Sequence, residues 1–131
     1  MQWTTEQESV INHTAGDLLV AAAAGSGKTA VLVQHVISRI MDPVDPVKLS
    51  EMVIMTFTEA AAQEMRDRIK AALEEKLREH PDSAELIREA GSIQNASIST
   101  IDAFCKHFIT ENYAAIDLDP GFRMGDQGEL K

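Results

Sequence analysis

The feature that most constrains the fold of this chain is the segment at residues 22–29, which reads AAAGSGKT. It follows a continuous apolar run and precedes apolar residues at helical spacing, which is where a phosphate-binding P-loop stands between a strand and a helix. Glycines at positions 25 and 27 let the backbone wrap closely, so that consecutive N–H groups and the positive end of the helix face an anion. The usual motif opens with glycine, and Ala22 holds that place here, so the strict pattern is not met.

Two side chains of this segment carry the chemistry expected of a nucleoside phosphate site. Lys28 can reach the β and γ phosphates as a point charge, and the Thr29 hydroxyl can coordinate Mg²⁺. We therefore predict that Lys28 and Thr29 are the catalytic residues and that Thr29 is the metal ligand. The alternative is a glycine-rich turn that only caps the following helix, and the Gly-Lys-Thr sequence with its flanking pattern disfavours it.

Helices and strands are expected to alternate along the chain. Apolar periodicity predicts helices at residues 4–13, 28–41, 59–79, 82–90 and 102–113, and strands at residues 17–24, 52–57 and 96–101. Thr4 and Gln7 have the spacing of a capping box, and Thr58 and Asp82 can cap two later helices. In the long helix, apolar residues at every fourth position leave Arg66 facing solvent. This alternation favours an α/β fold with a parallel sheet, flanking helices and right-handed crossovers.

The composition limits which partners and which cellular setting are expected for the chain. Its 131 residues suffice for one domain with its own core, and 12 basic against 21 acidic residues give a net charge of 12 − 21 = −9. A free-standing nucleic-acid binder usually presents a basic surface, which this chain as a whole lacks. The longest apolar run, at residues 18–24, is too short to span a bilayer, so no membrane partner is expected. The single Cys105 is expected to be a buried small apolar residue, and a reducing, cytoplasmic setting fits it.

Three motifs, in order along the chain, give it a resemblance to a known family. Residues 25–29 read GSGKT, residues 56–66 read TFTEAAAQEMR and residues 99–105 read STIDAFC. Together they resemble the first motifs of superfamily 1 helicases of the UvrD/RecB kind, and the resemblance covers essentially the whole chain. It implies a fragment of a RecA-like P-loop NTPase core. Residues 1–131 would form the N-terminal part of the helicase ATP-binding domain, truncated before its acidic Mg²⁺-binding motif.

The resemblance also implies roles for the residues around the P-loop. Gln7 matches a glutamine with which such helicases read adenine through its amide, and the capping box with Thr4 competes for the same side chain. The implied cofactors are ATP and Mg²⁺. The implied ATP site consists of Gln7, Ala22, Ala23, Ala24, Gly25, Ser26, Gly27, Lys28, Thr29 and Ala30.

Four further residues match positions that contact DNA in the family. Thr56, Phe57 and Thr58 match the motif along the single-stranded DNA path, where a ring can stack on a base and hydroxyls can bond phosphate. Phe57 ends a strand expected to be buried, so it could equally be a core residue. Thr100 matches a phosphate-contacting threonine, against the alternative of an ordinary hydroxyl at a strand end. Asp102 stands where related helicases often have His, and it is suited instead to cap the helix that follows.

The activity implied by the resemblance is ATP-driven movement in the 3′ to 5′ direction along single-stranded DNA, coupled to exonuclease processing of double-strand breaks before recombination. DNA ends and a second, B-type subunit of the same helicase/nuclease complex are the implied partners. Phosphoryl transfer also needs metal and cationic groups that a P-loop alone does not supply. The segment alone is therefore expected to bind nucleotide weakly at most, without catalysis or translocation.

Two other classes of function are compatible with a P-loop. One is a small phosphotransferase, similar to a kinase, that acts on a metabolite and uses Asp102 or Asp117 to bind Mg²⁺. A strand that carries such an acid usually has several consecutive apolar residues before it, whereas residues 97–101 alternate and the apolar stretch at residues 114–116 is short. The other class is a non-catalytic module that keeps the loop only to bind an anion.

Overall fold

The computed structural model describes residues 2–123 and residue 125. Pro120 and three glycines predict irregular structure for residues 117–131, and part of that segment lies outside the described residues. Its α-helices are α1 (Thr5–Ile11), α2 (Lys28–Ile40), α3 (Glu59–Glu79), α4 (Ala84–Ser92) and α5 (Ile101–Asn112). Its strands are β1 (Val53–Thr56) and β2 (Ser97–Thr100), and its short 3₁₀ helices are η1 (Leu49–Glu51), η2 (Ile93–Asn95) and η3 (Tyr113–Ile116). Of the helices in this part of the chain, none combines the length and the apolar character that crossing a membrane requires.

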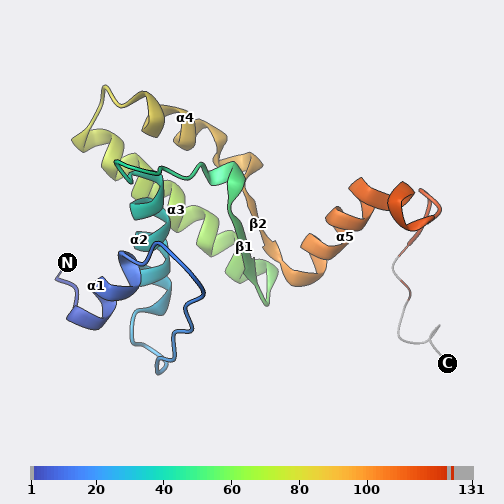
Figure 1. Cartoon of the computed structure of the whole chain (residues 1–131), viewed down its shortest axis with the longest axis horizontal. Helices are drawn as coiled ribbons and strands as arrows, with labels where there is room; N and C mark the ends of the chain where they lie inside the picture. The colour runs from blue at the N-terminus through green and yellow to red at the C-terminus, as the bar shows by residue number, and fades with distance from the viewer. Residues whose placement is uncertain (1, 124, 126–131) are drawn as a thin grey trace.

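The sheet consists of β1 and β2, which pair in parallel (Figure 1). The register aligns Val53 with Ser97 and Thr56 with Thr100, so the carboxyl ends of both strands lie at one edge of the sheet. The chain passes from β1 to β2 through α3 and α4, the kind of helical crossover that parallel strands require. The predicted α/β fold with parallel strands and flanking helices is thus confirmed, and both strands lie within their predicted ranges.

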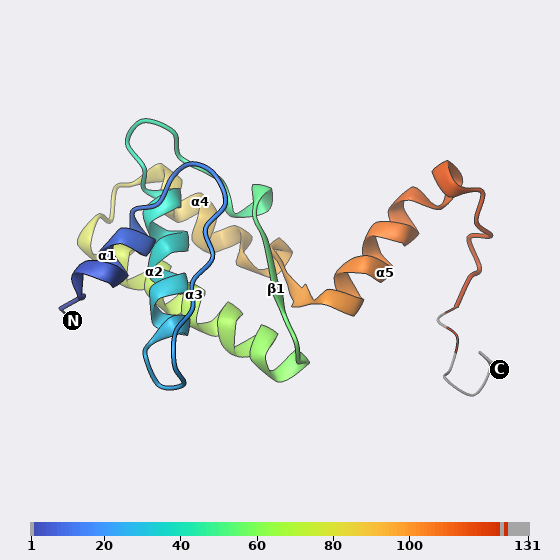
Figure 2. The same ribbon diagram turned by 60° about the horizontal axis from the view of Figure 1, so that its bottom comes forward.

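The predicted strand at residues 17–24 is wrong. This segment has no regular secondary structure, and its apolar side chains Leu18, Leu19 and Val20 are 48%, 95% and 45% exposed. A continuous apolar run forms a buried strand only when neighbouring strands pair with its backbone and both of its faces are covered. In the described part of the chain the sheet contains β1 and β2 alone, and the segment instead passes beside α2 as an extended loop (Figure 2).

Hydroxyl caps fix where three of the helices begin. Thr4 and Gln7 form the predicted capping box at α1, and Thr58 caps α3, whose bounds match the prediction. At α4 the cap is Ser83 and not the predicted Asp82, because the Ser83 hydroxyl accepts the hydrogen bond from a backbone N–H of the first turn. Each cap satisfies an N–H group that the helix itself cannot pair, so local sequence determines these boundaries.

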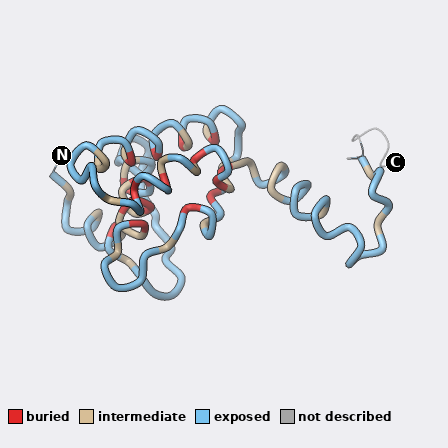
Figure 3. The backbone as a smooth tube through the Cα atoms, turned by 90° about the horizontal axis from the view of Figure 1, so that it is seen from above, coloured by how far each residue is buried: buried red, intermediate tan, exposed pale blue. Residues whose placement is uncertain are grey.

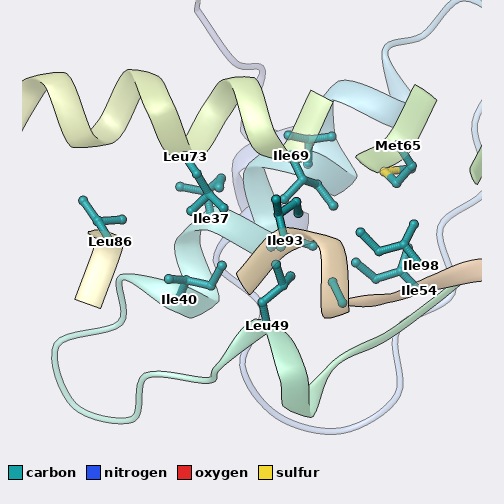
Figure 4. Close-up of a cluster of buried hydrophobic side chains, with 13 residues drawn as sticks. Ile37, Ile40, Leu49, Ile54, Met65, Ile69, Leu73, Leu86, Ile93 and Ile98 are labelled. Carbon is teal, nitrogen blue, oxygen red and sulfur yellow. The ribbon is translucent and has the colours of Figure 1, made fainter. Parts of the chain in front are cut away.

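The hydrophobic core lies between α2 and α3 and is completed by α4, the sheet and the 3₁₀ helices η1 and η2 (Figure 4). Ile69 and Leu73 of α3 are fully buried, and Ile37 of α2 is 1% exposed. Burying aliphatic side chains of this size stabilises the fold by about 1.5 to 3 kcal/mol each. The cluster consists of Val33, Val36, Ile37, Ile40, Leu49, Ile54, Met65, Ile69, Leu73, Leu86, Ile93, Ala96 and Ile98.

One carboxylate is buried at the edge of this core. Glu89 on α4 is 3% exposed, and its Oε2 atom accepts a hydrogen bond from the Leu49 N–H at 2.8 Å. Its Oε1 atom accepts a hydrogen bond from the Arg88 side chain at 3.2 Å. Both oxygens are therefore paired, as a charge removed from water requires, and the contact ties α4 to η1.

Arg66 does not face solvent as the helical pattern predicts. The residue is half-buried, and its Nη2 atom donates a hydrogen bond to the Ile98 carbonyl of β2 at 2.7 Å. Its Nε atom is buried and has no hydrogen-bond partner among the described residues. The prediction failed because periodicity along α3 identifies the apolar stripe but not the side on which the sheet packs against it. Arg66 thus links α3 to β2.

Helix α5 projects away from the packed body, and buried residues are confined to the rest of the chain (Figure 3). None of its residues is buried, so the prediction that Cys105 is buried is wrong. The cap of α5 is Thr100, whose hydroxyl accepts a first-turn N–H at 3.2 Å, and the predicted cap Asp102 lies one residue inside the helix. Because β2 runs directly into α5, the last residue of the strand, Thr100, is also the N-cap of the helix.

Candidate functional site

The turn that leads into α2 is built on two glycines, as the predicted phosphate-binding loop requires. Gly25 and Gly27 have φ angles of +77° and +83°, in the left-handed region that residues with a Cβ atom rarely adopt. The Ser26 N–H donates to the Ala23 carbonyl at 3.2 Å, which closes the turn. The Gly27 carbonyl then accepts from the Val31 N–H at 3.0 Å and begins α2. The turn therefore needs glycine at both positions.

The amino end of α2 is open to an anion. The other four α-helices in the described part of the chain begin with side-chain caps, which are Thr4, Thr58, Ser83 and Thr100. Gly27 has no side chain to cap α2, and the first turn of α2 has no acidic residue. The first N–H groups of a helix have no partner within it and carry the positive end of its dipole. The N–H groups of Lys28, Thr29 and Ala30 can therefore hold a phosphate group.

The Lys28 side chain folds back onto the loop. Its Nζ atom donates hydrogen bonds to the carbonyl of Ala22 at 2.8 Å and to that of Ala23 at 3.3 Å. An ammonium group has three donors, so these two bonds leave one for a ligand. Residues 21–29 are all exposed, and Thr29, the predicted metal ligand, is among them. These residues fit a phosphate group with its Mg²⁺, since they bring a positive charge, open N–H groups and a hydroxyl to one accessible loop.

Gln7 contacts both the start of α1 and the P-loop. Its Oε1 atom accepts from the Thr4 N–H at 2.9 Å, and its Nε2 atom donates to the Ser26 carbonyl at 3.3 Å. A Cβ atom at Gly27 would lie 3.6 Å from Nε2, so the amide and the loop are in close contact. Nearby, the carboxylate of Glu6 accepts hydrogen bonds from its own N–H and from the Thr4 hydroxyl, which hold its pKa below the ordinary value. The Gln7 side chain therefore takes part in the capping box and contacts the glycine loop at the same time.

A pocket of about 810 Å³ lies between α1, the loop at residues 16–22 and α2. Its apolar wall is provided by Val10, Leu18, Val20, Val31 and Leu32, and Gln7 and Lys28 lie among its polar lining residues. A pocket of this size, mostly apolar with a few polar groups, is typical of a site for a small ligand such as a nucleotide base. The site therefore combines a glycine turn, which leaves the first N–H groups of α2 open, with an adjacent apolar pocket.

Two histidines of this pocket were missed by the sequence reasoning. The His13 ring bonds the Gly16 carbonyl at 3.0 Å through Nε2, and the His35 ring bonds the Ile11 carbonyl at 3.0 Å through Nδ1. Both bonds attach a pocket-lining ring to the backbone around α1. The signal in the sequence was the spacing of Leu32 and His35, which places both on one face of α2.

The four residues predicted to contact DNA lie together at the carboxyl ends of the strands, which we call the threonine edge (Thr56, Phe57, Thr58 and Thr100). Thr56 and Thr100 are paired in register, and Phe57 and Thr58 connect β1 to α3. Phe57 is 92% exposed, so the alternative that it belongs to the core is wrong. The P-loop and the threonine edge lie toward the same lower side of the molecule in Figure 1 and Figure 2.

The acids required by a small phosphotransferase are placed unfavourably for that function. Asp102 is exposed in the first turn of α5, and Asp117 follows η3 at the far end of that projecting helix (Figure 1). Within residues 2–123 and 125, side chains of His, Cys, Asp and Glu form no group of three or more that could hold a metal ion. In this geometry the P-loop residue suited to contact Mg²⁺ is Thr29.

Comparisons with known proteins agree with this geometry. The chain matches the family described as the UvrD/REP helicase N-terminal domain over residues 3–131. It is similar to proteins named as the A-type subunit of an ATP-dependent helicase/nuclease from Clostridium perfringens (50% identical), Oceanobacillus iheyensis (45%) and Bacillus velezensis (49%). The matches cover 99%, 99% and 97% of this chain and 10% of each relative, so the chain spans about a tenth of their length. A family match over nearly every residue shows that the chain belongs to the UvrD/REP helicase family through its N-terminal domain.

Proposed function

We propose that this chain is the ATP-binding and DNA-contacting segment of the A-type subunit of an ATP-dependent DNA helicase/nuclease. The observation that carries the proposal is the convergence of three groups on one loop. These are the uncapped amino end of α2, the Lys28 ammonium held by two loop carbonyls, and the Gln7 amide on the Ser26 carbonyl. All three adjoin an apolar pocket of about 810 Å³. Proteins named as such subunits, half of whose residues are identical to this chain over the matched region, support the same function.

In this proposal the N–H groups of the loop and of α2 hold the phosphates, and Lys28 pairs with their charge. Thr29 contributes its hydroxyl to Mg²⁺, which when bound offsets negative charge on the phosphates. Gln7 uses its amide to read adenine at the mouth of the apolar pocket. In the same proposal the segment is the N-terminal part of a RecA-like ATP-binding domain.

The threonine edge supplies the DNA contact in this proposal. The exposed ring of Phe57 stacks on a base, and Thr56, Thr58 and Thr100 contact the phosphates from the same edge of the sheet. The parent protein moves 3′ to 5′ along single-stranded DNA in the cytoplasm and processes DNA ends before recombination. It works with a B-type subunit of the same complex.

Exchanging Gln7 for glutamate tests the proposed adenine contact. A glutamate at this position can still accept the Thr4 N–H, so the capping box survives, but the amide donor is lost. We expect the preference for an ATP analogue over its GTP counterpart, both with Mg²⁺, to fall by roughly tenfold in calorimetric titration. The control is Gln94→Glu, which makes the same charge change at an exposed site in η2. An unchanged preference in Gln7→Glu would remove Gln7 from the base site.

Replacing Phe57 with Ala tests the DNA contact. Stacking of a base on an aromatic ring is worth about 1 to 3 kcal/mol, so the affinity for single-stranded oligothymidine should fall by roughly fivefold to a hundredfold. Phe57→Trp should retain it. Phe108→Ala is the matched control, because Phe108 is 57% exposed on α5. Fluorescence anisotropy measures the affinity, and an equal loss in both alanine variants would contradict the specific role of Phe57.

A further inference from the structure

Glu59 contacts the threonine edge directly. It lies in the first turn of α3, next to Thr58, and its Oε1 atom accepts a hydrogen bond from the Thr100 hydroxyl at 3.1 Å. The bond joins residues 41 positions apart and bridges the amino ends of α3 and α5. Because Glu59 is exposed, its carboxylate shares the solvent-accessible space that DNA would enter at this edge.

The hydrogen bonds of Thr100 use the only proton of its hydroxyl. The oxygen accepts the Ala103 N–H at 3.2 Å, as the cap of α5, and the single hydroxyl proton goes to Glu59. A hydroxyl has one proton to donate, and an ionised phosphate oxygen can only accept. Thr100 can therefore donate to a phosphate only after its bond to Glu59 is broken.

The other two threonines of the edge differ from Thr100 in this respect. The Thr56 hydroxyl donates to the Thr58 carbonyl at 3.0 Å, a neutral acceptor. The Thr58 hydroxyl accepts from the Ala61 N–H at 3.1 Å, a bond that leaves its own proton available. A charged acceptor holds a proton more strongly than a neutral one, so Thr100 is the threonine whose donor is held most firmly.

The negative charge of Glu59 also opposes binding of a DNA phosphate. Its carboxylate lies in the first turn of α3, where the helix dipole favours a negative group. A DNA phosphate at the threonine edge would be drawn to the same positive helix ends and would be repelled by a carboxylate already there. The Glu59 carboxylate thus occupies the position at these helix ends where an anion would otherwise bind.

We infer that Glu59 is a positioning residue that weakens single-stranded DNA binding at the threonine edge, because it holds the Thr100 proton and repels the phosphate. The inference rests on the DNA contact proposed above. Binding of DNA then requires the Glu59–Thr100 hydrogen bond to break, and this competition makes the contact at Thr100 readily reversible. Such a contact suits a protein that must release each phosphate as it moves.

Removing the Glu59 carboxylate tests this inference. Glu59→Ala should bind fluorescein-labelled oligothymidine roughly threefold to tenfold more tightly than the unmodified chain in fluorescence anisotropy at low salt. Glu75→Ala is the matched control, since it removes the same charge from an exposed position on the same helix. Its affinity should stay close to that of the unmodified chain. A gain in Glu59→Ala no larger than that in Glu75→Ala would overturn the inference.

Variants of Thr100 separate the loss of charge from release of the hydroxyl. The gain from Glu59→Ala should persist in a Thr100→Ser background, which keeps both the hydroxyl and the cap of α5. It should shrink in a Thr100→Val background, which has neither, and circular dichroism verifies that this variant remains folded. An equal gain from Glu59→Ala in both backgrounds would show that Thr100 plays no part, and the inference would fail.

The outcome also distinguishes this inference from the proposed function. DNA binding that Phe57→Ala weakens and Glu59→Ala leaves unchanged would overturn the role of Glu59 alone. Absence of DNA binding in the folded unmodified chain and in Glu59→Ala would overturn the DNA contact itself, and the inference with it. Binding that both variants alter in the expected directions supports both.

Discussion

Lys28→Ala is expected to weaken binding of an ATP analogue with Mg²⁺ by roughly tenfold to a hundredfold, because hydrogen bonds to a charged group contribute about 1.5 to 3 kcal/mol. The expectation follows from the position of the ammonium, which donates to the carbonyls of Ala22 and Ala23 beside the uncapped end of α2. Lys28→Ala removes the positive charge that the Lys28 side chain brings to the loop. It also removes the two hydrogen bonds that connect the segment before Gly25 to the start of α2. Isothermal titration calorimetry measures the loss.

Two comparisons make this prediction specific. Lys70→Ala removes the same charge from an exposed position on α3, where Lys70 pairs with Glu74 at 3.9 Å, and should leave nucleotide affinity unchanged. Lys28→Arg keeps the charge but not the compact shape of the ammonium, so it should recover only part of the affinity. If Lys28→Ala binds nucleotide as well as Lys70→Ala does, the loop is not the phosphate site.

The second large effect concerns stability. Ile69 on α3 is fully buried in the core cluster, so Ile69→Ala leaves a cavity that close-packed neighbours fill only in part. We expect the free energy of unfolding to fall by about 2 to 5 kcal/mol in urea titration followed by circular dichroism. That is a large fraction of the stability of a domain of this size.

Ile87→Ala is the matched control for this prediction. Ile87 is 53% exposed on α4, so the same truncation should lower the free energy of unfolding by no more than about 1 kcal/mol. A similar loss in both variants would mean that the cluster around Ile69 does not form the core of the fold.

Much of the fold could be predicted where local signals decide it. The long helix α3 was predicted with its observed bounds, because Thr58 caps its start and apolar residues at every fourth position mark its buried side. Both parallel strands were predicted to within one residue at each end, since an apolar run at β1 and an alternating pattern at β2 each lead directly into a capped helix. The left-handed conformations of Gly25 and Gly27 agree with the predicted loop, because few other residues adopt them.

The failures at residues 17–24, Arg66 and Cys105 share a physical cause, which is that contacts distant in sequence leave no local mark. The apolar run at residues 17–24 has the composition of a buried strand, yet pairing depends on neighbouring strands and not on the run itself. Cys105 was assigned to the interior from its residue type, and α5 projects into solvent. The bonds from Arg66 to Ile98 and from Thr100 to Glu59 join residues 32 and 41 positions apart, beyond the reach of periodicity.

The central claim, that residues 25–30 bind the phosphates of ATP, is tested most directly by nuclear magnetic resonance. The backbone amide signals of the ¹⁵N-labelled chain are followed while a non-hydrolysable ATP analogue is added with Mg²⁺. The account predicts that the largest shifts fall on Gly25, Gly27, Lys28 and Thr29, with smaller ones at Gln7, and that Lys28→Ala strongly reduces them. Shifts centred on another surface, or a folded chain whose loop amides do not respond, would contradict it.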